Sequence, residues 1–397
     1  MELRTAKGRL FVLILLFLVF PLLNGNFNIV KSAPLNGIWL ANKPAFSYKA
    51  WWNGSYQEAM NKHLNDSVGF RADMIRFDNQ IDFTFFKQLN AGDMILGKHN
   101  DLFYKDYVAA YCGTDYASDN YPINILVKMK KVQDTLERLG KTFVFVHSAS
   151  KVSYAPEDIP EDIPCNSGGK TNIKNYMRIG DSLGIHQLDF NSWYASLKGK
   201  TEHPLFNPQG IHWTLYGALW AVDSLISYIE QRRNIHMLHP IWSEIVHTAK
   251  TRLHEDDMES ILNFMFPMDT SGYWYPKWHY ADKSGKGYTK PRVVYIGDSF
   301  IGTLDADGMM NSDTAAEYWF YFRDVWVEDK TPLTYDNMGS YNFVKSSGDM
   351  NAYHWQEVML KADCIVVMYT AAKLVKEGDA FINKAYEYFY PKEDKQG

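Results

Sequence analysis

The stretch PRVVYIGDSFIGTL, residues 291–304, begins like a buried strand and breaks off at Gly-Asp-Ser. Its residues 293–296 are β-branched or aromatic, which favours a strand covered on both faces. Residues 297–299 then have two interpretations. They form an ordinary strand-to-loop turn, because Gly, Asp and Ser are common turn residues. Alternatively, Ser299 is a nucleophile at the carboxyl end of a parallel strand, which is where open α/β sheets bind their ligands.

Three other runs are also strand-like, and helix-like segments lie between the strands: KTFVFVHSAS (141–150), IHQLDF (185–190) and DCIVVMYT (363–370). This alternation predicts an α/β fold with a doubly wound parallel sheet. The predicted strands end in small or polar residues, namely Ser148, Asp189, Ser299 and Thr370. Because such a sheet gathers its strand ends along one edge, we expect a site there.

Other segments complete the expected organisation. Residues 34–90 carry apolar side chains at helix-like spacing, which predicts a largely helical region. Residues 93–106 (DMILGKHNDLFYKD) predict a hairpin. Residues 235–290 are less regular, and we interpret them as an insertion that covers the edge of the sheet.

The composition of the chain argues against one class of function, nucleic-acid binding. The chain has 397 residues, 22% of them charged, and a formal net charge of −5, so it lacks the basic surplus that nucleic-acid binding needs. Aromatic residues make up 15% of the chain, with 12 Trp and 26 Tyr. These side chains serve either as core packing or as surfaces that stack on sugar rings, and composition does not separate the two.

The N-terminus has the pattern of an export signal. Arg4, Lys7 and Arg9 precede LFVLILLFLVFPLL, residues 10–23, which contains no polar residue. We therefore interpret residues 1–33 as a signal-anchor or signal peptide and assign residues 34–397 to one domain. The sequence KSA at 31–33 is a poor cleavage site because of its Lys, which favours an uncleaved anchor with its basic end in the cytoplasm.

Export to an oxidising compartment would allow the three cysteines to form disulfides. Cys112 and Cys165 lie in loop-like sequence, so we expect them to pair in an oxidising compartment. Cys364 lies in the apolar run CIVVMY and is expected to be a buried small hydrophobe. The cysteine spacings match no metal motif, and we expect neither a metal nor a cofactor.

A nucleophilic serine needs a base, because its hydroxyl is almost fully protonated near neutrality. Among the 12 histidines, His212 stands out because it lies in NPQGIHWTLYGA, residues 207–218, where a loop leads into a helix. The N-terminus of a helix disfavours imidazolium and would keep the base neutral. The alternative is a structural histidine at a helix start that stacks on Trp213.

These motifs together resemble the SGNH-hydrolase-like family of polysaccharide O-acetyltransferases, the alginate-acetylation proteins of the periplasm. The resemblance spans roughly residues 50–375 and rests on five segments in order: NDSVGFRADMIRFDNQI (65–81), ILGKHNDLFY (95–104), FVFVHSASKVSYAPEDIP (143–160), GIHWTLYGA (210–218) and YIGDSF (295–300). Each motif is weak alone, but the series of five is fairly specific.

The resemblance implies a fold, a site and partners. In the family, a Gly-Asp-Ser-Phe motif supplies the nucleophile, which maps onto Ser299, and a His-Trp motif supplies the base, which maps onto His212. The base precedes the nucleophile, an order permuted from that of ordinary GDSL esterases. The resemblance further implies a periplasmic protein at the inner membrane, a polysaccharide acceptor, and a membrane-bound O-acyltransferase as acetyl source.

One departure from the family affects the site. Where the family has an Asp two residues before the His, this chain has Gly210. That Asp would hold the imidazole in the correct tautomer, and its loss can cost several orders of magnitude in rate. Another carboxylate replaces it, a backbone carbonyl orients His212, or the protein is weak or inactive. The candidate carboxylates are Asp298, Glu202 and Asp189.

The remaining expectations concern binding. We expect Trp213, Ser148 and Lys151 to contact substrate, and the backbone N–H groups of Ser299 and of the loop at 148–150 to stabilise an oxyanion. For Tyr216, helix packing is the favoured interpretation. Two other functions compete with acetyl transfer: an acetylesterase that uses the same residues, and a catalytically silent polysaccharide-binding subunit of an export complex.

Overall fold

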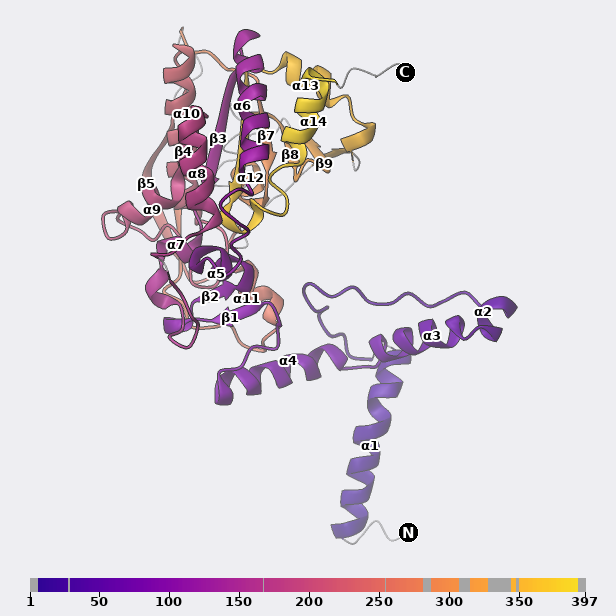
Figure 1. Ribbon diagram of the computed structural model, residues 1–397. Coiled ribbons are helices and arrows are strands. Elements are labelled where there is room, and N and C mark those ends of the chain that lie inside the picture. The colour runs from indigo at the N-terminus through magenta and orange to yellow at the C-terminus, as the bar shows by residue number, and fades with distance from the viewer. Residues whose placement is uncertain are drawn as a thin grey trace. The chain divides into compact units, whose positions relative to one another are not determined.

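The computed structural model describes residues 6–27, 29–166, 168–253, 255–280, 287–306, 315–327, 344–347 and 350–391 (Figure 1). The chain divides into two compact units. Unit 1 comprises Met1–Gly92 and Met258–Met268, and unit 2 comprises Asp93–Asp257 and Asp269–Gly397.

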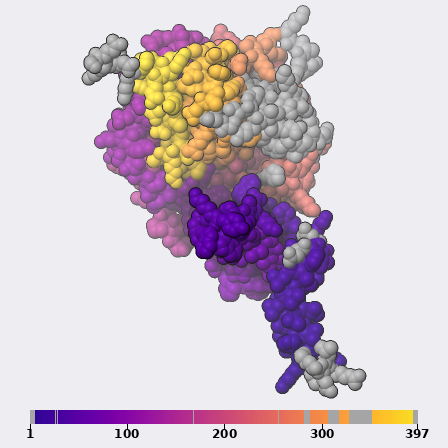
Figure 2. Space-filling model, turned by 90° about the vertical axis from the view of Figure 1, so that its right-hand side faces the viewer, coloured from indigo at the N-terminus to yellow at the C-terminus, as the bar shows by residue number. Residues whose placement is uncertain are grey.

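Residues 48–86 of unit 1 are mostly helical, as the spacing of apolar residues in 34–90 predicts, whereas residues 29–47 contain no helix. The main helices of unit 1 are α1 (Ala6–Phe27), α2 (Tyr48–Trp52), α3 (Ser55–Asp66) and α4 (Arg71–Ile81), and a π-helical turn, η1 (Asp82–Phe86), continues α4. The apolar part of α1, Ala6–Gly25, is long enough to cross a membrane, as a signal sequence or an anchor would be. These N-terminal residues are indigo in the space-filling view of Figure 2.

Unit 2 contains a seven-stranded sheet with the order β10-β9-β8-β7-β11-β3-β4. The strands from β8 to β4 are parallel, whereas β9 and β10 pair in antiparallel fashion at one edge. The strands are β3 (Thr142–Ser148), β4 (Gln187–Asp189), β7 (Val293–Gly297), β8 (Ala315–Phe320), β9 (Asp324–Val327), β10 (Val344–Ser347) and β11 (Cys364–Thr370). The predicted α/β fold with a parallel sheet is confirmed, while the antiparallel edge was not expected.

Helices cover both faces of this sheet. The central strands β3, β7 and β11 are buried throughout, because their alternate residues belong to two separate hydrophobic clusters. Four helices pack on one face: α6 (Ile123–Arg138), α8 (Asn172–Leu183), α13 (Trp355–Lys361) and α14 (Ala380–Phe389). The other face carries α9 (Phe190–Leu197), α10 (Leu215–Arg233) and α12 (Ser299–Ala306). This arrangement is the doubly wound one that the sequence predicts.

The parallel strands end side by side, as expected. Thr370 at the end of β11 pairs with Ser148 at the end of β3, and His147 pairs with Asp189 at the end of β4. On the other side of β11, Met368 pairs with Gly297, two residues before Ser299. The four predicted strand ends therefore lie along one edge of the sheet.

Two hairpins complete unit 2. The first joins β1 (Met94–Leu96) and β2 (Leu102–Tyr104), as predicted for residues 93–106. The second joins β5 (Pro240–Thr248) and β6 (Tyr273–Tyr280) within the segment 235–290, which the sequence had marked as irregular. The short helix α11 (Asp257–Leu262) begins between these two strands, and residues 281–286 lie outside the described part of the chain.

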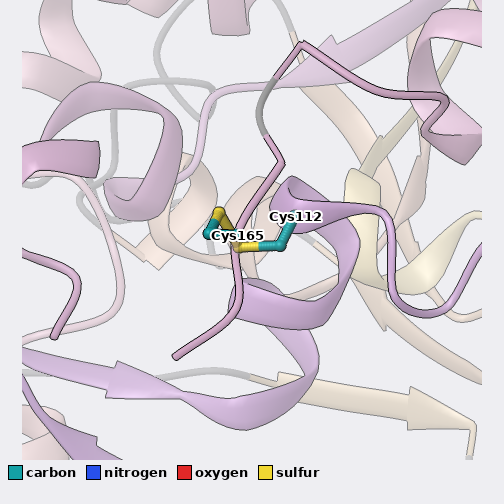
Figure 3. Close-up of a disulfide and its surroundings, with 2 residues drawn as sticks. All are labelled: Cys112 and Cys165. Carbon is teal, nitrogen blue, oxygen red and sulfur yellow. A yellow bond between two sulfur atoms is a disulfide. The ribbon is translucent and has the colours of Figure 1, made fainter. Parts of the chain in front are cut away.

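A disulfide joins Cys112 at the end of helix α5 (Lys105–Cys112) to Cys165, which follows it by 53 residues (Figure 3). The predicted pair is therefore confirmed, and Cys364 is buried in β11 as expected. The loop that Cys165 begins returns to α5, because a side chain at Gly113 would meet the Lys170 carbonyl at 2.3 Å. The disulfide thus fastens this loop to α5, whose Tyr107 hydroxyl lies 3.4 Å from Thr370 Oγ1 at the end of β11.

Candidate active site

Ser299 is the first residue of α12, directly after the turn that ends β7. The turn is held by Asp298, a fully buried side chain that accepts hydrogen bonds from Thr370 N and Oγ1, both at 2.8 Å, and from Phe300 N at 3.1 Å. Burial raises the pKa of Asp298, and these hydrogen bonds act in the opposite direction. Asp298 therefore locks the turn onto the end of β11 and leaves Ser299 half-buried and accessible.

His212 lies beside Ser299, with its Nε2 at 2.8 Å from the Ser299 Oγ. The loop that carries His212 leads into α10, whose N-terminus is capped by Thr214. Trp213 anchors this loop by donating from Nε1 to Thr303 Oγ1 at 3.0 Å. The imidazole also packs against Phe300 at 4.9 Å between ring centroids. Two segments that are 87 residues apart thus bring a hydroxyl and an imidazole into hydrogen-bond contact.

The other nitrogen of His212 is bound by a carboxylate that the sequence analysis missed. Asp257 Oδ2 lies 2.6 Å from His212 Nδ1, and Asp257 Oδ1 accepts a hydrogen bond from Ile211 N at 2.8 Å. Burial alone would raise the pKa of Asp257, but His212, the Ile211 N–H and Lys151 outweigh it and lower that pKa. The carboxylate is therefore held in its charged form. The side chains of His212 and Asp257 are 20% and 26% exposed, so the pair is not sealed in the interior.

None of the three candidate carboxylates from the sequence is the partner of His212. Asp298 points into the turn described above. Asp189 caps α9 by accepting from Ser192 N at 3.1 Å. Glu202 is a surface residue with an 82% exposed side chain. Of the three alternatives that Gly210 leaves open, the structure shows a carboxylate from elsewhere beside His212, and it comes from the start of α11.

Gly210 explains how Asp257 reaches His212. A Cβ atom at Gly210 would lie 2.3 Å from the Glu255 carbonyl oxygen and 3.4 Å from Asp257 Oδ1. Gly210, which stands where the family has an Asp, therefore leaves space for the backbone at Glu255, and this allows Asp257 to reach His212. The acidic run Glu255-Asp256-Asp257 within a segment expected to cover the sheet edge is the only sequence signal that points to it.

Two buried ionisable residues support the chain on both sides of His212. Glu255 accepts from Leu215 N at 2.6 Å and from Asn207 Nδ2 at 2.9 Å, and burial raises its pKa to about 7. Lys151 donates to the carbonyls of Pro208 at 2.7 Å and Asn207 at 3.4 Å. Burial lowers the pKa of Lys151 to about 8, against the opposing effect of nearby carboxylates.

The three residues expected to contact substrate are all buried. Trp213 is 2% exposed, Ser148 is 0% exposed and Lys151 is 3% exposed. Because water and ligands do not reach them, we correct this expectation: Trp213 and Lys151 hold the His212 loop, and Ser148 accepts from Asn191 Nδ2 at 2.7 Å through its carbonyl. Tyr216 is 5% exposed and packs in the core, as its favoured interpretation states.

Of the backbone N–H groups expected to stabilise an oxyanion, only some are free to donate. Ser299 N lies in the first turn of α12, where N–H groups lack an intrahelical acceptor. On the loop at 148–150, Ser150 N already donates to Ser153 Oγ at 3.3 Å. The geometry therefore favours Ser299 N over Ser150 N as a donor to developing negative charge.

The same edge of the sheet also carries a pocket of about 290 Å³, whose lining includes Tyr107, Tyr111, Ser150, Asn191 and Ala371. It is linked to the serine turn by Thr370, whose Oγ1 lies 3.4 Å from the Tyr107 hydroxyl and 2.8 Å from Asp298 Oδ2. No cluster of three or more His, Cys, Asp or Glu residues suited to a metal ion occurs in the part of the chain that the structure describes.

Comparisons with known proteins give matches in structure alone. No protein-family model matches the chain, and no curated protein matches it in sequence. The O-acetyltransferase domain of Pseudomonas putida AlgJ is similar at a TM-score of 0.44 and 14% identity, covering 74% of this chain and 99% of that one. Pseudomonas aeruginosa AlgX has a TM-score of 0.42 and 14% identity, covering 72% and 68%.

Bacillus cereus PatB1 is a third similar structure, with a TM-score of 0.37 and 10% identity, covering 65% of this chain and 91% of that one. The chain is thus similar in structure to AlgJ, AlgX and PatB1, at low sequence identity.

Proposed function

We propose that the protein is a serine O-acetyltransferase that acetylates an exopolysaccharide through an acetyl-serine intermediate. The observation that carries the proposal is the continuous series of hydrogen bonds from Ser299 Oγ to His212 Nε2, at 2.8 Å, and from His212 Nδ1 to Asp257 Oδ2, at 2.6 Å. A hydroxyl, a base and an orienting carboxylate in this order form the arrangement that activates a serine.

The first half-reaction forms the intermediate. Ser299 Oγ attacks the acetyl carbonyl while its proton moves to His212 Nε2, and Asp257 stabilises the resulting imidazolium. The Ser299 N–H donates to the oxyanion of the tetrahedral intermediate. As that intermediate collapses, the bond to the donor's leaving group breaks and His212 returns the proton to the leaving group.

The second half-reaction uses the same residues in reverse. A sugar hydroxyl gives its proton to His212 Nε2 and attacks the acetyl-serine carbonyl. Collapse of the second tetrahedral intermediate breaks the bond to Ser299 Oγ, which takes back the proton. Transfer rather than hydrolysis requires that the sugar outcompete water, so the acceptor must be bound closely enough to exclude it.

The biological setting follows from the sequence motifs and the N-terminal helix. We place the catalytic unit in the periplasm, attached to the inner membrane by residues 1–33, with a membrane-bound O-acyltransferase as the acetyl source. The acceptor class is an exopolysaccharide. The order of His212 before Ser299 matches the permuted SGNH arrangement of the acetyltransferase family.

The competing functions differ in what they require. An acetylesterase would use the same three residues and lack only the bound acceptor. The main argument for a catalytically silent polysaccharide-binding subunit was Gly210, which stands where the family has an Asp. Asp257 weakens this argument because it puts a carboxylate beside the base.

The test is to mix the purified protein with a chromogenic acetyl ester and an oligosaccharide and to analyse both products. Acetylated sugar detected by mass spectrometry supports transfer, and acetate alone supports the esterase. Ser299→Ala should abolish both products. If polymer acetylation is unchanged in Ser299→Ala while polysaccharide binding persists, the silent subunit is correct.

A further inference from the structure

Unit 1 exposes large apolar side chains over most of its length. From Ile38 to Phe86, thirteen of them are exposed: Ile38, Trp39, Leu40, Phe46, Tyr48, Trp51, Trp52, Leu64, Val68, Met74, Phe77, Phe85 and Phe86. A soluble surface rarely carries so dense a set of apolar side chains, so these residues indicate a binding surface.

The turn between α3 and α4 is fixed to the C-terminal end of α1. Gly69 N donates to the Pro21 carbonyl at 3.0 Å, and the rings of Phe20 and Phe70 lie 5.5 Å apart. The contact is close, because a Cβ atom at Gly69 would meet the Pro21 oxygen at 2.5 Å. The N-terminus of α4 therefore lies at the level of the last turns of α1.

The length of α1 indicates how deep in a membrane this contact would lie. A helix of 22 residues is about 33 Å long, which matches the roughly 30 Å hydrocarbon core of a bilayer. If α1 spans the membrane, its last turns reach the boundary between acyl chains and headgroups. The turn between α3 and α4 then lies in that boundary as well.

The start of α4 presents an apolar stripe at this level. Phe70, Met74 and Phe77 follow one another at helical spacing, and Met74 and Phe77 are 43% and 57% exposed. Phe70 and Met74 also line a groove of about 450 Å³ whose other wall is α1, from Leu13 to Pro21. Every residue that lines the groove is apolar, so it suits a hydrocarbon chain and offers a polar ligand no partner.

Trp39 and Leu40 belong to the same end of unit 1. Ala41 N donates to Asp66 Oδ2 at 2.8 Å, and the Ala41 carbonyl lies 2.9 Å from His63 Nδ1. The segment is thereby fastened to the last turn of α3, next to the turn that contacts α1. Trp39 is 96% exposed, and tryptophan is enriched at membrane interfaces, where its ring lies among the headgroups.

We propose that unit 1 contains a second lipid-binding element beside α1: the groove between α1 and α4 binds a phospholipid acyl chain, and Trp39, Leu40 and the apolar stripe of α4 lie in the interfacial layer of the same leaflet. The occupant is lipid because the surface continues directly from a helix of membrane length. The proposal is independent of the chemistry assigned to Ser299.

The test uses the full chain reconstituted into vesicles of equal parts phosphatidylcholine and phosphatidylglycerol, with no other protein present. The photoreactive substitution Met74→p-benzoylphenylalanine is irradiated, and phospholipid adducts are measured by mass spectrometry. The control is the same substitution at Leu360, which has a similar exposure of 37% but lies on α13 of unit 2. We expect several-fold more lipid adduct at position 74.

A second measurement follows Trp39 without any photoreactive group. In vesicles with brominated acyl chains, Trp39→Phe should lower the quenched part of the tryptophan fluorescence, whereas Trp274→Phe, on β6 of unit 2, should leave it unchanged. Equal or absent adducts at positions 74 and 360 would overturn the proposal, and so would quenching that does not depend on Trp39. An intact mass showing that α1 is cleaved off would overturn it too, because the groove would not exist.

Discussion

Tryptophan has opposite roles in the two units. In unit 2, Trp319 and Trp213 are 0% and 2% exposed, and the Nε1 atoms of both donate hydrogen bonds, at 2.9 Å to Glu317 and at 3.0 Å to Thr303. In unit 1, Trp39 and Trp52 are 96% and 84% exposed. The high aromatic content therefore has two explanations. In unit 2 the tryptophans pack around the candidate site, and in unit 1 they form an exposed surface that we propose contacts lipid.

A charged side chain contributes differently to stability near the candidate site of unit 2 and on the surface of unit 1. Near the candidate site in unit 2, the buried side chains of Lys151 and Glu255 are each held by two or more hydrogen-bond partners, so removing either side chain leaves those partners unpaired. In unit 1, ion pairs such as Lys62 with Glu58 have side chains that are 68% and 71% exposed, and water replaces either partner. Substitutions should therefore have large effects at these buried groups of unit 2 and small ones at exposed pairs such as Lys62 with Glu58 in unit 1.

The largest effect is expected for Asp257→Asn. The amide keeps the shape of the side chain but favours the wrong tautomer of His212 and cannot stabilise the imidazolium, so the rate of acetyl transfer should fall about ten-thousandfold. Steady-state kinetics with a chromogenic acetyl ester measures the fall. Glu202→Gln, at an 82% exposed carboxylate that the sequence had nominated, is the matched control and should be neutral. A fall of less than about tenfold in Asp257→Asn would show that this carboxylate does not orient the base.

The next effect is on stability. Lys151 Nζ also lies 3.5 Å from Asp101 Oδ1, and both side chains are buried. Lys151→Met should destabilise the protein by roughly 3–5 kcal/mol, because it removes one partner of this buried ion pair and leaves Asp101 uncompensated. Lys62→Met in unit 1 breaks an exposed pair and should change stability by less than about 1 kcal/mol. Denaturant unfolding of both variants measures the difference. If the two losses are equal, the contrast between the units is wrong.

The disulfide is expected to contribute somewhat less. Because it closes a loop with a separation of 53 residues, its removal in Cys112→Ser with Cys165→Ser should cost roughly 2–4 kcal/mol, mainly by freeing the unfolded chain. Cys364→Ser is the control for loss of a cysteine outside the disulfide. Thermal unfolding under oxidising conditions compares the variants. A double variant as stable as the parent would contradict the prediction.

The smallest effect depends on pH. Glu255 has an ordinary pKa of 4.5 that burial raises to about 7, so the folded state favours the protonated acid. Its contribution to stability is therefore complete below pH 4.5 and is lost as pH rises through about 7. Between pH 5 and pH 8, the parent should lose about 2.5 kcal/mol relative to Glu255→Gln.

Unfolding free energies of the parent and of Glu255→Gln at several pH values test this slope. Parallel curves for the two proteins would show that Glu255 is not held in its protonated form.

Local pattern was enough to predict part of this structure. The runs that end at Ser148, Ser299 and Thr370 are β-branched or aromatic over a length that only a buried strand uses, so the parallel sheet could be predicted. The pairing of Cys112 with Cys165 followed from their loop-like context and from export. The contact between His212 and Ser299 was implied only by the resemblance of two motifs to the acetyltransferase family, and not by their spacing.

The rest depends on tertiary packing. Asp257 lies 45 residues beyond His212, in a segment without periodicity, and reaches it only because Gly210 leaves space for the chain at Glu255. Burial was also misjudged: Lys151 is a polar residue in a loop-like motif, which indicates exposure, yet the carbonyls of Asn207 and Pro208 hold it inside. No pattern in the sequence alone contains these contacts.

The most direct test of the site is to trap the nucleophile. The purified chain is incubated with an activated acetyl or sulfonyl donor, and the labelled residue is identified by peptide mass. We expect one label, on Ser299, that is lost in His212→Ala and strongly reduced in Asp257→Asn. A label on another residue, or a Ser299 label that is unchanged in His212→Ala, would contradict the proposed mechanism.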